Sequence, residues 1–182
     1  MKKKKTIWII LVVLIFFILF VTFKWNDVQE YLALRKSIIW TPNVELKVSD
    51  FQFDPDQNYI DNFSARVGIV NVHRITDSIV LRSTTVFLPE NSYVSDTSDA
   101  NFIRIAQARF DLCEVYRRKL VSKIINLNKG NIKSITLDSI VKYENLFYES
   151  FETEWDKFNE LSKNERMKGL VEMENYIQQE LK

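Results

Sequence analysis

Few side chains in this 182-residue chain could carry catalysis by the commonest routes. His73 is the only histidine and Cys113 the only cysteine, so a histidine-based zinc site and an internal disulfide are both excluded. We interpret His73 as an ordinary residue of a strand or its turn. Cys113 is predicted to be a small buried hydrophobe of a helix, with an intermolecular disulfide as the alternative. The three glycines cannot build a phosphate-cradling loop, and no G-x-S-x-G motif is present.

A predicted helix over residues 137–158 carries two side-chain clusters. The acidic cluster consists of Glu149, Glu152, Glu154 and Asp156. It could bind a cation, but four acids spread around a helix usually form a solvated face. The aromatic cluster consists of Phe147, Phe151, Trp155 and Phe158. We interpret it as packing against a sheet or another helix, with a partner-binding groove as the alternative.

The most informative segment is NFIRIAQARFDLCEVYRRKL, residues 101–120. Its apolar residues recur mostly at spacings of three and four, which predicts a helix. In zinc peptidases such a helix carries H-E-x-x-H, whose two histidines bind one Zn²⁺ while the glutamate acts as general base. The corresponding residues of this chain are Ile105, Ala106, Gln107, Ala108 and Arg109, so none of the three required side chains is present.

The residues around this motif are similar to a family of bacterial exported or membrane-anchored zincin-like proteins, domain-of-unknown-function family 922. The family's helix reads H-E-Q-G-H-F-D-I-A-E-x-Y-A-R-K-L. The residues that agree with it are Gln107, Phe110, Asp111, Glu114, Tyr116, Arg118, Lys119 and Leu120, and Leu112 replaces Ile. Looser agreement involves Trp40, Asp50-Phe51, Ser64-Ala65 and Phe87-Leu88-Pro89. The resemblance covers about residues 38–181, and only the helix motif is specific. It implies a zincin-like α+β fold, with Asn164 where a third ligand would stand.

The resemblance implies a degenerate site. Ile105 has no ligating atom, Ala106 cannot move a proton, and a protonated Arg109 has no lone pair for a metal. We therefore expect no catalytic residue, no metal ligand and no cofactor. Arg109 is either exposed or occupies the emptied metal cavity, where it would pair with Glu114 or another acidic residue. The candidate cleft residues are Gln107, Asp111 and Glu114.

These expectations favour a pseudoenzyme, that is, a zincin-like envelope domain that acts by binding a protein or a peptide. The first alternative is an active envelope hydrolase or peptidase with an atypical site. The second is a structural envelope protein whose resemblance to the family is only ancestral.

The chain begins with a cluster of lysines, Lys2–Lys5, followed by an uncharged apolar run, Thr6–Phe23. The run is long enough to cross a bilayer and lacks a small-x-small cleavage pattern, which predicts an uncleaved signal anchor with a cytoplasmic N-terminus. The rest would then be a periplasmic or extracytoplasmic part of a bacterial inner-membrane protein. Without Lys24 and the first four lysines, acidic residues outnumber basic ones, which argues against nucleic acid as a partner.

The remaining elements follow from periodicity and turn residues. We expect strands at 44–53, 63–73 and 78–88, with the last two forming a hairpin, and then a loop over 89–100. Long helices should follow at 101–128 and 137–158, with a third around 170–181. The predicted fold is α+β: a transmembrane helix, a small antiparallel sheet and long helices. The predicted divisions are 1–24 for the basic tail and anchor, 25–40 for a tether and 41–182 for the exported domain.

Overall fold

The computed structural model describes residues 14, 17, 20, 21, 24–56, 62–75, 78–98, 101–129 and 135–182. Over these residues the fold is α+β, with the strands before the long helices. This order follows from the sequence, since β-branched alternation occupies the first half of the chain and helical periodicity the second.

The larger sheet is built on the predicted hairpin, which is confirmed. Strands β4 (Val67–Ile75) and β5 (Ile79–Phe87) are antiparallel, with Val67 opposite Phe87 and Ile75 opposite Ile79. Strand β1 (Ile38–Ile39) pairs with the other edge of β5, giving the order β1-β5-β4. Residues 38 and 39, placed in the tether by the sequence, are thus part of the sheet.

The smaller sheet corrects the expectation of one antiparallel sheet. Strand β6 (Tyr93–Val94) lies between β2 (Gln52–Phe53), to which it is parallel, and β3 (Phe63–Ser64), to which it is antiparallel. The predicted strand 44–53 is wrong except at its end, since residues 44–47 are irregular and Val48–Asp50 form the 3₁₀ helix η1. The predicted loop 89–100 contains the 3₁₀ helix η2 (Pro89–Asn91) as well as β6.

Three long helices complete the fold, as predicted: α2 (Asn101–Asn128), α3 (Leu137–Asn159) and α4 (Lys163–Leu181). Thr136 caps α3 by accepting a hydrogen bond from the Ser139 amide, and Ser162 and Glu165 form a capping box at the start of α4. Because α2 contacts β4, β5, α3 and α4, apolar residues are buried around most of its circumference.

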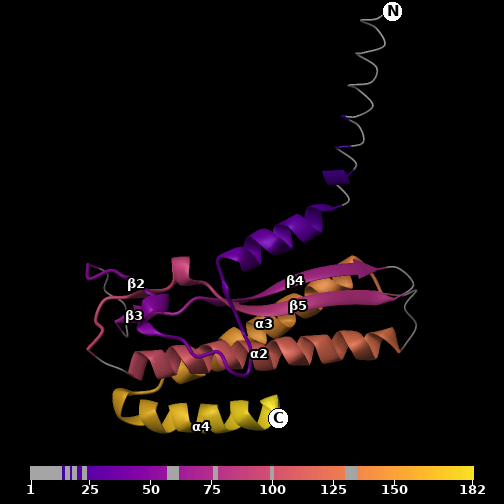
Figure 1. Cartoon of the computed structure of the whole chain (residues 1–182). Helices are drawn as coiled ribbons and strands as arrows, with labels where there is room; N and C mark the ends of the chain where they lie inside the picture. The colour runs from indigo at the N-terminus through magenta and orange to yellow at the C-terminus, as the bar shows by residue number, and fades with distance from the viewer. Residues whose placement is uncertain are drawn as a thin grey trace, which may run out of the picture.

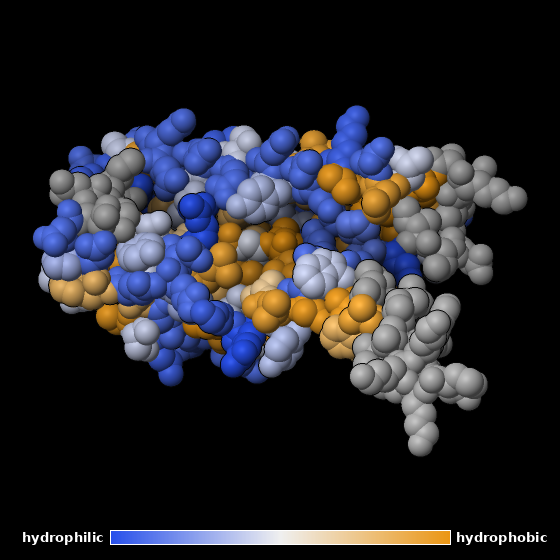
Figure 2. Space-filling model, turned by 90° about the horizontal axis from the view of Figure 1, so that it is seen from above, coloured by the Kyte–Doolittle hydropathy of each residue, from blue (hydrophilic) through white to orange (hydrophobic). Residues whose placement is uncertain are grey.

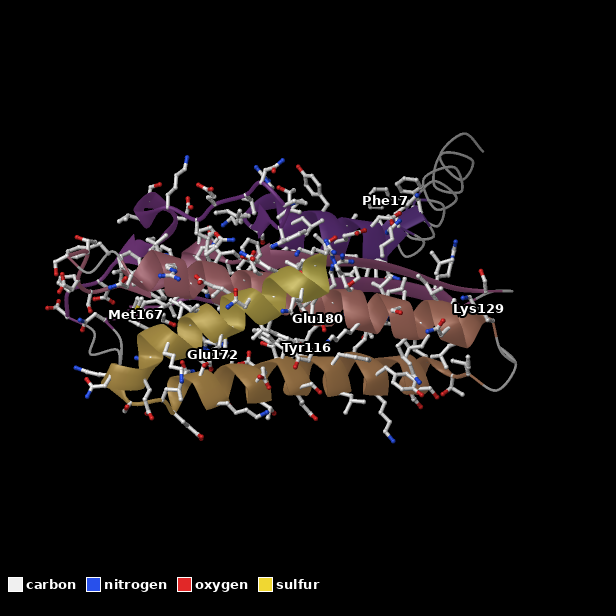
Figure 3. All side chains as sticks on the ribbon, turned by 90° about the horizontal axis from the view of Figure 1, so that it is seen from below. Phe17, Tyr116, Lys129, Met167, Glu172 and Glu180 are labelled. Carbon is white, nitrogen blue, oxygen red and sulfur yellow. The ribbon has the colours of Figure 1, made fainter. Side chains whose placement is uncertain are left out.

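The hairpin covers one side of α2, and α4 lies on the opposite side (Figure 1). Seen from below, α4 runs from the end of α3 towards the middle of α2 (Figure 3). Tyr116 of α2 lies near the C-terminal half of α4 in this view. The main core gathers around the N-terminal half of α2, including Phe87, Phe110 and Phe151. A smaller cluster around Leu120 and Ile124 lies at the far end of the hairpin. The position of α2 is thus fixed by its packing against the hairpin β4–β5 and against helices α3 and α4.

The helical residues 24–35 lie above the hairpin, where Arg82 of β5 pairs with Asp27 and Glu30. On the face seen from above, hydrophobic residues gather across the middle with hydrophilic residues around them (Figure 2). A hollow of about 310 Å³ separates these helical residues from β4, where Val70 and Val72 line it. Among the described residues that line this hollow, Glu30 is the only carboxylate and His73 the only imidazole.

The fold-class prediction is wrong about its first element. Within the residues that the structure describes, no helix has both the length and the apolar character needed to cross a membrane. The described architecture is therefore α+β without a transmembrane helix. Most of the predicted anchor, Thr6–Phe23, lies outside the described residues, as does the lysine cluster before it.

Candidate functional site: a groove along helix α2

The degenerate motif lies near the N-terminal end of α2, and the residues at its zinc-ligand and general-base positions face the interior. Ala106 is fully buried and Ile105 is 9% exposed, and both belong to the main core. Arg109 donates from Nη2 to both carboxylate oxygens of Glu152 on α3, at 3.0 Å each. Its guanidinium also lies 5.1 Å from the ring centroid of Trp155. The partner of Arg109 is therefore Glu152 of the acidic cluster, and the alternative of a water-exposed arginine is wrong.

Glu114, predicted as a cleft residue, is instead buried beneath β5. It accepts hydrogen bonds from Thr85 Oγ1 at 2.8 Å, from Arg117 at 2.6 and 2.7 Å, and from Arg118 Nε at 3.0 Å. Burial raises the pKa of this carboxyl, but the hydrogen bonds from Arg117, Arg118 and Thr85 outweigh burial, so its pKa lies below the ordinary value. Glu114 therefore joins α2 to the hairpin and is a structural residue.

Gln107 and Asp111, the other two predicted cleft residues, lie together on a different side of α2. Gln107 Nε2 donates to Asp111 Oδ1 at 2.9 Å, one helical turn away. Gln107 Oε1 accepts from the backbone amide of Leu46 at 2.9 Å. Asp111 Oδ1 also accepts from the indole Nε1 of Trp40 at 2.7 Å. Gln107 and Asp111 are thus held in place by residues 40–46, the segment that precedes the 3₁₀ helix η1.

These contacts form the floor of a groove between α2, α4 and the irregular segment 40–46. The groove has two adjoining parts with volumes of about 430 and 510 Å³, and Gln107 and Asp111 line both. The α4 wall contributes Ile177 and Gln178 to both parts. The residues that line only one part include Ile103, Arg104, Glu174, Trp40, Val44, Arg118 and Leu181. Apolar walls around a few fixed polar groups are the usual composition of a ligand site.

The charge of the groove is centred on Asp111. Arg104 forms a bidentate pair with Glu174 at 2.6 Å, and Arg118 is engaged by Glu114. Within the described part of the chain, Asp111 has no arginine or lysine at ion-pair distance. Burial raises the pKa of the Asp111 carboxyl, although the hydrogen bonds from Trp40 and Gln107 oppose this. The groove therefore contains a carboxylate that is partly desolvated and not neutralised.

The other residues considered from the sequence do not join this groove. His73 Nδ1 lies 3.4 Å from Glu144 Oε1, between β4 and α3, and burial raises the pKa of Glu144 while His73 opposes the shift. Cys113 is buried in the core, and burial raises the pKa of its thiol, which keeps it protonated. Asn164 is exposed in the first turn of α4. Among the described residues, no three His, Cys, Asp or Glu side chains are grouped so that they could hold a metal ion.

Sequence reasoning identified the floor of the groove and missed its walls. Gln107 and Asp111 share a helical face by their spacing of four, and Trp40 is part of the family resemblance. The irregular segment 41–46 and the face of α4 with Ile177 and Gln178 carry no motif that would have placed them opposite α2. Two long-range contacts reveal that the segment forms a wall: the Leu46 amide donates to Gln107, and the Trp40 indole donates to Asp111.

Comparison of the chain with models of protein families, with curated proteins and with solved structures gives no match. The resemblance to the zincin-like family therefore stays a prediction from the sequence.

Proposed function

We propose that this protein is a non-catalytic binding domain that takes a peptide segment of a partner protein in the groove between α2, α4 and residues 40–46. The observation that carries the proposal is the fixed floor: Trp40 and Gln107 both donate to Asp111 Oδ1, beside open space. A polar group that is positioned before the ligand arrives lowers the entropic cost of binding.

The dimensions and lining of the groove support a peptide. Each part has the volume of an ordinary ligand site, and the two parts follow one another along α2 and α4. An extended chain could place successive side chains in the two parts. Ile103, Ile177 and Val44 offer apolar contacts, while Gln178 offers donor and acceptor atoms at the rim.

The lack of a reactive group near Asp111 supports binding without chemistry. Hydrolysis needs a nucleophile or an activated water, together with a group that stabilises the developing charge. Among the described residues that line the groove there is no His, Cys, Ser or Tyr, and Thr41 carries the only hydroxyl group. Ile105 and Ala106 are packed in the core, and the charge of Arg109 is directed to Glu152. No observation favours the alternative of a hydrolase.

The test is peptide selection on the full-length protein, followed by affinity measurements on groove variants. Val44→Arg would place a long side chain in the groove, and Val48→Arg makes the same change at an exposed position outside the groove lining. We expect selected peptides to lose about tenfold or more in affinity with Val44→Arg, a change of about 1.4 kcal/mol, and little with Val48→Arg. The proposal is overturned if no peptide is selected, or if both variants bind as the natural protein does.

A further inference from the structure

The groove has a property that identifies its ligand more closely, and the inference rests on the proposed function. We infer that the groove recognises a positively charged group of the bound peptide, a lysine or arginine side chain or a free amino terminus, with the carboxylate of Asp111 as its partner. The inference depends on the distribution of hydrogen bonds on Asp111, on its lack of a counter-ion, and on the charges around it.

The two oxygens of Asp111 differ in their contacts. Both hydrogen bonds to this side chain end on Oδ1, from Trp40 Nε1 and from Gln107 Nε2. Within the described residues, Oδ2 accepts no hydrogen bond, and it is not one of the fully buried unpaired atoms. One oxygen therefore fixes the side chain while the other stays available to a group that enters the groove. A carboxylate oxygen is an acceptor only, so the entering group must be a donor.

Neutral donors leave the negative charge of Asp111 in place. The indole of Trp40 and the amide of Gln107 satisfy an acceptor position, but they bring no positive charge. A half-buried ion is costly unless an opposite charge pairs with it. A ligand that further covers Asp111 without pairing with it would increase this cost. A cationic ligand would instead gain a charge-assisted hydrogen bond, which is stronger than one between neutral groups.

The charged residues nearby favour the same ligand. The negative charges of Glu114 and Glu174 act on Asp111 in the same direction as burial, and Glu45 also lines both parts of the groove. Arg104 is satisfied by the bidentate contact with Glu174. Arg118 and Lys182 line the 510 Å³ part of the groove, but Arg118 pairs with Glu114 and neither residue forms an ion pair with Asp111. At Asp111 itself, an anionic group of a peptide would therefore be repelled and a cationic group attracted.

The experiment uses peptides that differ at one position and leaves the full-length protein unchanged. A peptide selected for binding is prepared with lysine, norleucine or glutamate at its anchoring position, each with a free or an acetylated amino terminus. Norleucine keeps the aliphatic chain and removes the charge. We expect affinity to fall at least tenfold from lysine to norleucine, and further to glutamate. If acetylation alone causes this loss, the amino terminus is the recognised cation.

A variant then assigns the preference to Asp111. Asp111→Asn keeps a carbonyl oxygen for Trp40 and Gln107 and removes the charge, while Asp156→Asn is a matched change on the exposed surface of α3. The preference for the cationic peptide should fall at least tenfold with Asp111→Asn and persist with Asp156→Asn. Near-ultraviolet circular dichroism checks that both variants are folded.

The outcomes separate this inference from the proposed function. If peptides bind the groove but neither removal of the lysine charge nor acetylation of the amino terminus weakens binding, the cation inference is wrong and the peptide-binding function stands. The inference is also wrong if Asp111→Asn keeps the full preference for a cation. If no peptide binds at all, the proposed function itself fails. The comparison of peptides on the natural protein decides whether the groove prefers a cation even if the Asp111 variant does not fold.

Discussion

The indole Nε1 of Trp40 donates a 2.7 Å hydrogen bond to Oδ1 of Asp111, although the two residues are 71 positions apart in the chain. The backbone amide of Trp40 donates at the same time to the carbonyl of Thr85 on β5, at 3.0 Å. Trp40 is therefore fixed to the sheet through its backbone and to α2 through its side chain. Because the irregular segment 40–46 begins at this residue, the contact determines where one wall of the groove stands.

Replacement of Trp40 by Phe should destabilise the protein. Phenylalanine preserves much of the aromatic surface but removes the donor, which leaves the half-buried carboxylate of Asp111 with one hydrogen bond fewer. Loss of one donor to a charged acceptor costs about 1–3 kcal/mol. Urea unfolding at neutral pH measures the change. Trp25→Phe is the matched control, since Trp25 is 50% exposed, and it should alter the unfolding free energy by less than about 0.5 kcal/mol. Equal effects of the two changes would show that the hydrogen bond to Asp111 adds nothing to stability.

Asp111→Asn should change how stability depends on pH. Burial raises the pKa of Asp111 above 3.8, so the folded state binds this proton more tightly than the unfolded state does. The natural protein should therefore lose stability relative to Asp111→Asn as pH rises from 3.8 through the pKa of the folded state. Unfolding free energies measured by urea between mildly acidic and neutral pH test this. If the difference between the two proteins stays constant over that range, the carboxyl is not desolvated as the groove geometry indicates.

The main helices and the hairpin could be predicted from the sequence because each depends on a local signal. Spacings of three and four mark α2, and β-branched residues on either side of a short connection mark β4 and β5. The short strands β2, β3 and β6 have two residues each and carry no such signal. Their pairing depends on where α2 and the hairpin bring distant segments together, which a local pattern does not contain.

In the candidate site, too, the local arrangement could be predicted from the sequence and the long-range packing could not. Helical geometry alone places Gln107 with Asp111, and Ile105 with Arg109, on two different sides of α2. It does not say which element covers which side. The aromatic cluster of α3 covers the side of Arg109, where Phe151 and Trp155 lie under the guanidinium. The side of Asp111 is only partly covered, by α4 and by residues 40–46. Tertiary packing therefore decides which side of the motif is a groove.

The pair Arg109–Glu152 should contribute measurably to stability because neither side chain is well solvated. The side chains are 17% and 30% exposed, and the guanidinium is also held over two aromatic rings. A double-mutant cycle with Arg109→Met and Glu152→Gln should give a coupling energy of about 1–2 kcal/mol in urea unfolding. The exposed pair Lys157–Glu154, whose side chains are 66% and 40% exposed, serves as the control and should give less than about 0.5 kcal/mol. A coupling energy for Arg109–Glu152 no larger than this would mean that the pair is solvated in solution.

Glu114→Gln should be the most destabilising of these changes. Two arginines and Thr85 donate to this carboxylate, whose side chain is 2% exposed. Glutamine cannot accept all of these hydrogen bonds and leaves two positive charges without their partner, which should cost about 3 kcal/mol.

The folded-state pKa of Glu114 lies below 4.5, so the carboxylate stabilises the fold above that pH and the benefit is lost as pH falls through the lowered pKa. The gap in unfolding free energy between the natural protein and Glu114→Gln should therefore be largest near neutral pH and shrink in acid. Glu154→Gln removes an exposed carboxylate from the same kind of local pair, with Lys157, and should change stability little at any pH. If the two glutamine variants unfold at the same urea concentration at neutral pH, Glu114 does not join α2 to the hairpin in the way its contacts indicate.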